Sequence, residues 1–171
     1  MTAVLAGNVD LMCDETVDPS EREAYCEPAV RPALRQWLRQ AFAGTVRVSE
    51  ASPRRDTNYS ALKVVRLRTS SGAEVGLATS AVSRNGQPKM RYPITTALIA
   101  SFEVVGARRR PTGNPAERSL EGLAAGRAVL ERAGVPGIPD QRGGIFGWEE
   151  FRQREERRAM VLRSRSRRDR M

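Results

Sequence analysis

The sequence of 171 residues contains no histidine, only two cysteines and two lysines, and 5% aromatic residues. Without imidazole, histidine general acid–base catalysis, Ser-His-Asp and Cys-His nucleophiles and zinc sites with histidine ligands are excluded. The two cysteines, Cys13 and Cys26, are too few for a structural zinc site, which normally takes four ligands in paired spacing. These absences exclude much of the usual hydrolytic and zinc chemistry.

Motifs for other catalytic sites are also missing. No P-loop and no dinucleotide-binding fingerprint occurs in the sequence. Asp56 and Glu74 could hold the divalent metal of a nuclease, but Gly76 stands where the lysine of such a motif is expected. Tyr59 or Tyr92 could act as a nucleophile, but neither has a histidine near it. We therefore predict no enzymatic activity, no metal, no cofactor and no small-molecule substrate.

Long apolar runs are absent as well. No window approaches the roughly 18 apolar residues that span a bilayer, and Gly7 and Asp10 interrupt the apolar character of residues 1–12. We therefore expect no signal peptide and no membrane partner, and a location in the cytoplasm or within a virion. In a reducing cytosol Cys13 and Cys26 are expected to be free thiols, although they could pair.

Positive charge is abundant and unevenly placed. The formal net charge is +9. It combines −6 from residues 1–30, +11 from 31–112, −2 from 113–150 and +6 from 151–171. Nearly all the cations are arginines, whose guanidinium groups bind phosphate bidentately. Two basic blocks behind an acidic segment indicate a polyanionic partner, most often nucleic acid.

The residue pattern predicts an α+β fold, in which a small antiparallel meander of three or four strands packs with helices. A flexible acidic N-terminal arm and a basic C-terminal helix and tail flank it. The predicted division is a partly disordered acidic arm (1–28), an α+β core domain (29–134), a Pro/Gly-rich linker (135–147) and the basic helix and tail (148–171). We expect the linker to let the last helix swing out, and the arginine-rich end to have little reason to fold.

Local signals place the elements of this core. Apolar spacing predicts a helix over 31–43, with Pro32 in its first turn and Gly44 after its end. Alternating residues predict strands over 45–50, 60–69, 74–83 and 87–92, and Asn85-Gly86 is a hairpin turn signal. Residues 94–105 are expected to be a buried helix, with a strand as the alternative. Asn114, Pro115 and Glu117 predict the start of a helix that runs to Ala133.

Basic side chains recur in five groups that could contact phosphates. One group is a stripe on the helix over 31–43, one lies on neighbouring strands, two are in loops and one is in the tail. The ordinary alternative is that each group forms the solvated side of its own element. The predicted contact residues are Arg31, Arg35, Arg39, Arg47, Arg54, Arg55, Lys63, Arg66, Arg68, Arg108, Arg109, Arg110, Arg163, Arg165, Arg167 and Arg168.

From these groups we predict a protein that binds DNA or RNA through backbone phosphates, with limited sequence specificity. The composition would suit an accessory protein of a phage or mobile element. The acidic arm is hypothesised to fold back over a basic face and compete with nucleic acid. The alternative is a structural or assembly protein, such as a virion component. Its acidic arm would dock on the basic face of another copy, making a homo-oligomer.

Overall fold

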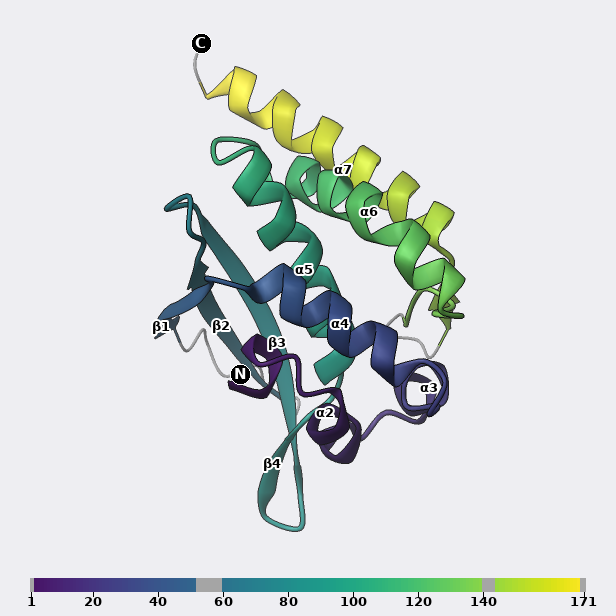
Figure 1. Ribbon diagram of the computed structural model, residues 1–171. Coiled ribbons are helices and arrows are strands. Elements are labelled where there is room, and N and C mark those ends of the chain that lie inside the picture. Colours follow the sequence, from purple (N-terminus) through teal and green to yellow (C-terminus); the bar gives the residue numbers. More distant parts are fainter. Residues whose placement is uncertain (1, 52–59, 140–143, 170–171) are drawn as a thin grey trace.

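The computed structural model describes residues 2–51, 60–139 and 144–169 and has the expected α+β fold. A four-stranded antiparallel sheet of order β1-β2-β3-β4 forms one layer, and helices cover one of its faces (Figure 1). The strands are β1 (Val46–Ala51), β2 (Ser60–Arg68), β3 (Glu74–Arg84) and β4 (Gln87–Met90). The helices are α1 (Thr2–Leu5), α2 (Val9–Glu15), α3 (Pro19–Tyr25), α4 (Arg31–Phe42), α5 (Pro93–Arg109), α6 (Pro115–Arg132) and α7 (Trp148–Arg168). The short strands β5 (Ile138–Pro139) and β6 (Ile145–Phe146) pair separately.

Alternation along the strands decides which face of the sheet is buried. Val65 and Leu67 on β2 are buried, while Arg66 between them is exposed. Helix α5 packs against β3 on the buried side. Asn85 and Gly86 both have positive φ, 52° and 74°, which confirms the two-residue turn between β3 and β4.

Helix α5 forms the centre of the helical layer and confirms the helix predicted for its segment. It is buried almost all round, so its sequence shows little amphipathic periodicity. Helix α6 approaches it closely because glycines stand at the crossing. A Cβ atom added at Gly122 would lie 1.9 Å from the Phe102 carbonyl oxygen, and one added at Gly106 would lie 1.9 Å from the Arg118 carbonyl oxygen.

The N-terminal segment differs from the expectation of a solvated acidic arm. Val4, Val9, Met12 and Tyr25 are at most 1% exposed and belong to the core. Acidic side chains occupy much of the outer side of these short helices. The composition of the segment therefore gave no indication that its apolar residues are buried. The segment is therefore part of the folded body.

The buried carboxylate of Glu21 ties α3 to the start of α5. It accepts hydrogen bonds from the Thr16 hydroxyl (2.7 Å) and the Thr95 backbone N–H (2.5 Å). Tyr92, the residue before α5, makes no side-chain cap, so Glu21 satisfies one of the N–H groups that a helix start leaves unpaired. Burial raises the pKa of Glu21.

Cys13 and Cys26 form a disulfide, so the expectation of two free thiols is wrong for this structure. Their Cα atoms are 5.7 Å apart, because α2 packs beside the C-terminal end of α3. Sequence spacing carries no information about that packing, which is why the pairing could only be left open.

The segment before α7 is anchored, so the last helix does not swing free. Val135 and Ile138 are buried, and the Tyr25 hydroxyl donates a hydrogen bond to the Gly137 carbonyl oxygen. The Trp148 indole N–H donates to the Val135 carbonyl oxygen at 3.0 Å. Helix α7 then lies along α6 and continues to Arg168, which corrects the expectation of an unfolded basic tail (Figure 1). Starting a helix is unfavourable, but extending one that is already packed is not. The arginine-rich residues can therefore continue α7 although they would not form a helix alone.

Candidate nucleic-acid interface

Elements distant in sequence meet at one end of the molecule, where the ends of α5 and α7 lie near the start of α6 (Figure 1). The Arg163 Nε donates to the Glu117 carboxylate at 2.5 Å, joining α7 to α6. The Arg118 Nη1 donates to the Glu74 carbonyl oxygen at 2.9 Å, joining α6 to β3. This end, which we call the basic end, therefore brings together two of the predicted groups of arginines.

The last residues of α7 project beyond the first turn of α6 (Figure 1). Residues 163–169 are all exposed. Residues 164–169, which we call the α7 tip, carry Arg165, Arg167 and Arg168, and none of these arginines forms an ion pair within the described part of the chain. Asp169 leaves the tip with a net charge of +2. The tip is thus a cationic, exposed helix end, and the side that carries Arg167 faces the first turn of α6.

Other arginines of the basic end are occupied by carboxylates. Arg110 contacts Glu117 at 3.3 Å and Glu121 at 2.9 Å. Hydrogen bonds to the Glu117 carboxylate, the strongest from Arg163 and a further one from Arg110, hold the pKa of Glu117 below its usual value. These two arginines join helices to one another, and their charge is partly neutralised. We assign them a structural role.

Arg108 lies within α5 rather than in the exposed loop predicted for Arg108 to Arg110. Its guanidinium donates to the carbonyl oxygens of Gln40 (3.3 Å) and Ala43, and to the Thr45 hydroxyl (3.1 Å). It therefore satisfies carbonyl groups that the end of α4 leaves unpaired. Arg109, in the same turn, is exposed and has no ion pair with a described residue.

The sheet register separates the arginines of the neighbouring strands β1 and β2. Arg47 stands opposite Leu67, whose side chain is buried, so Arg47 leaves β1 on the helix-covered side of the sheet edge. Arg66 stands opposite Gly76 and leaves on the open side, as does Arg68. Arg47 therefore does not share a face of the sheet with Arg66 and Arg68, although all three lie on neighbouring strands as predicted. A register shift between Arg47 and Ser49 contributes to the difference.

The stripe on α4 is confirmed in position, but much of it is neutralised. Asp10 on α2 contacts Arg31 at 3.1 Å and Arg35 at 2.5 Å. Arg39 is exposed and has no ion pair with a described residue. Arg54, Arg55 and the side chain of Lys63 lie outside what the structure describes. On the open sheet face, Arg68 contacts Glu74 at 3.1 Å.

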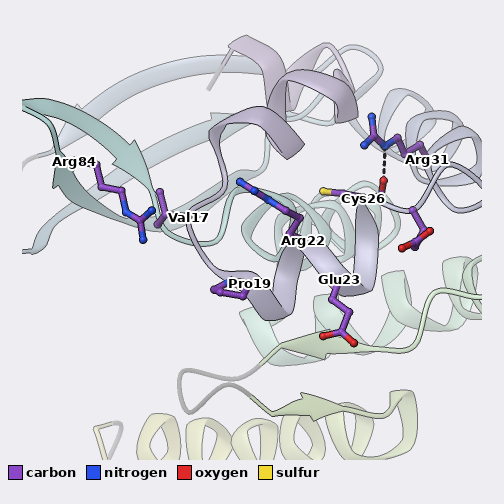
Figure 2. A pocket seen from close by; sticks show the side chains of 8 residues that line it. Val17, Pro19, Arg22, Glu23, Cys26, Arg31 and Arg84 are labelled. Carbon is purple, nitrogen blue, oxygen red and sulfur yellow. Dashed lines mark hydrogen bonds between the residues drawn. The ribbon is translucent and has the colours of Figure 1, made fainter.

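Sequence reasoning did not find a surface cavity of about 510 Å³ beside α3 (Figure 2). Figure 2 shows the side chain of Arg22 pointing from α3 toward Val17 and Arg84. Glu23 and Glu27 also line the cavity, so its charge is mixed. A second cavity, of about 470 Å³, lies between the start of α6 and the end of α7, with Arg163 and Arg167 in its wall. The second cavity belongs to the basic end.

No group of three or more metal-ligating side chains occurs within residues 2–51, 60–139 and 144–169. In the same ranges no helix has the length and apolar character to cross a membrane. Comparisons with protein-family models, curated proteins and solved structures found no match. The arrangement of the side chains themselves therefore carries the functional argument.

Proposed function

We propose that the protein binds nucleic acid through backbone phosphates, with the α7 tip as the main contact. The observation that carries the proposal is the projection of Arg165, Arg167 and Arg168 from an ordered helix end, with no ion pair to any described carboxylate. Arginines that are free of carboxylates release counterions from the polynucleotide when they bind, and this release drives association. Contacts to phosphate carry no direct sequence information, so discrimination between sequences is limited.

The proposal is tested by replacing the three arginines of the α7 tip with glutamine. The slope of log affinity against log salt for duplex DNA is expected to become shallower by about 2 to 3, because each phosphate contact contributes about 0.9. The measurement is a salt-titrated anisotropy series with the full chain. Circular dichroism checks that the variant stays helical.

The matched control removes three arginines from the other half of the same helix. Arg152 and Arg158 contact carboxylates of α7, and Arg154 lies over the Phe146 ring. Their replacement by glutamine is expected to leave the slope within about one unit of the parent, because these groups are already engaged. Equal losses in both triple variants, or an unchanged slope in the tip variant, would refute the proposed contact.

Asp10 supports the hypothesis that the N-terminal segment masks a basic stripe, because its carboxylate occupies Arg31 and Arg35. Asp10→Asn is expected to strengthen binding and to steepen the salt slope by up to about two, one for each arginine released. The control is Asp14→Asn, the same charge change at an exposed position of α2 with no ion pair to a described residue. If both variants bind equally tightly, the masking hypothesis is wrong. Deleting residues 1–27 is unsuitable, because it would remove core residues such as Val9 and Tyr25.

Assembly with other copies is a second candidate function, favoured by the apolar edge of the sheet. Val46 and Val48 on the edge strand β1 are 56% and 40% exposed. Unpaired strand edges with apolar side chains are templates for pairing with another chain. The acidic segment is packed on its own body, which weakens the form of this idea in which it docks on a neighbour. Light scattering in the absence of nucleic acid distinguishes the two candidate functions. A protein that is monomeric at all concentrations would exclude assembly with other copies.

A further inference from the structure

We infer that the ligand of the α7 tip is double-helical DNA, and that the tip enters the major groove. This inference rests on the proposed function and specifies its ligand. Three features of the structure carry it: the position of the aromatic side chains, the dimensions of the projecting helix end, and the directions in which its arginines point.

The first feature argues against single strands as the preferred ligand. Proteins that bind single-stranded nucleic acid commonly stack the bases on aromatic side chains. No aromatic side chain in the described ranges is exposed. Phe146 and Tyr92 are half-buried beneath Arg154 and Arg91, at 5.5 and 5.2 Å from guanidinium carbon to ring centre. The other described aromatic residues, all buried, are Tyr25, Trp37, Phe42, Phe102, Trp148 and Phe151.

The second feature is the size of the α7 tip. An α-helix rises 1.5 Å per residue, so the six residues beyond Arg163 extend by about 9 Å, and the helix with its side chains is about 10 to 12 Å wide. The major groove of B-form DNA is about 8.5 Å deep and 12 Å wide. The length and width of the exposed α7 tip are therefore comparable to the depth and width of this groove.

The third feature is the arrangement of the arginines around the tip. Residues three apart lie on the same side of a helix, so Arg165 and Arg168 share one flank. Residues two apart point to nearly opposite sides, so Arg167 occupies the other flank, where it borders the open cavity beside the start of α6. A helix end inserted in a groove has a phosphate strand on each side, and both flanks would then contact phosphates. On a flat or single-stranded polyanion only one flank could do so.

Double-stranded RNA does not fit this arrangement. Its A-form helix has a deep, narrow major groove, which protein side chains do not read. Its wide minor groove is shallow and would leave the projecting tip without two flanking walls. The geometry thus points to B-form DNA among the double-helical polynucleotides.

The test compares a 20-base-pair DNA duplex, one of its single strands and an RNA duplex of the same sequence, using the full chain at one salt concentration. We expect the DNA duplex to bind at least tenfold more tightly than either of the others. Arg165→Gln and Arg167→Gln should each make the salt slope for duplex DNA shallower by about one. A ligand that fills the major groove should displace the protein, whereas one that fills the minor groove should not.

The outcomes separate this inference from the proposed function. Equal affinity for the three polymers, a preference for the single strand or for RNA, or displacement by the minor-groove ligand alone would overturn the major-groove assignment and leave nucleic-acid binding intact. A salt slope that depends on only one of the two flanks would also overturn it. No binding to any polymer at low salt would overturn both.

Discussion

Gly122→Ala is expected to lower the free energy of unfolding by roughly 3 kcal/mol or to prevent folding, because overpacking a tight contact forces the backbone to move. The new Cβ atom would lie 1.9 Å from the Phe102 carbonyl oxygen, on the backbone of α5. Helix propensity alone makes the opposite prediction, since alanine in a helix interior is favoured over glycine by about 1 kcal/mol. The sign of the change in the free energy of unfolding therefore tests whether α5 and α6 are in close contact.

The matched control is Gly76→Ala on β3. A Cβ atom there meets nothing within 4 Å, and the backbone does not have the left-handed φ that favours glycine. This variant is expected to unfold at the same denaturant concentration as the parent or a slightly higher one, because alanine restricts the unfolded chain. Urea unfolding followed by circular dichroism gives both values. A Gly122→Ala variant as stable as the parent would contradict the close approach of α5 and α6 at Gly122.

Stability is expected to fall as the pH rises from about 4.5 to 7, because of a carboxylate buried between helices. Glu103 on α5 is 9% exposed, and burial raises its pKa from 4.5 to about 7, although Arg118 and Arg158 oppose the shift. A raised carboxyl pKa means that the folded protein binds the proton more tightly than the unfolded chain. Stability is then highest below pH 4.5 for this group and is lost as the pH passes through 7. The change is roughly 3 kcal/mol.

Glu103→Gln is expected to remove most of this dependence and to make the variant more stable than the parent at pH 8 by a similar amount. Burial also raises the pKa of Glu21 and of the neighbouring Glu155, so a dependence of the same sign should remain. The measurement is urea unfolding at pH 5, 6, 7 and 8. Glu23→Gln, at an exposed position on α3, is the control, and its stability should depend on pH as that of the parent does. A parent protein whose stability does not change between pH 5 and 8 would contradict the raised pKa of Glu103 and the burial that causes it.

Short-range signals were enough to predict much of the core. The turn at Asn85-Gly86 and the helix start at Asn114 depend on conformations and hydrogen bonds within a few residues. Asn114 indeed accepts a hydrogen bond from the Glu117 backbone N–H at 2.9 Å. The N-terminal segment was mispredicted because its helices have only four to seven residues and many acidic side chains. Such short helices are stable only when tertiary packing buries their apolar side.

The amino-acid sequence by itself determined the α+β class, the main turns and helix starts, and a large excess of arginine. Only the tertiary structure decided which arginines remain accessible and unpaired. Asp10 meets Arg35 across 25 residues, and Glu117 meets Arg163 across 46. The sheet register also placed Arg47 and Arg66 on different sides. The physical reason is that an ion pair depends on a separation of a few ångströms in space, and that separation exists only once the chain has packed.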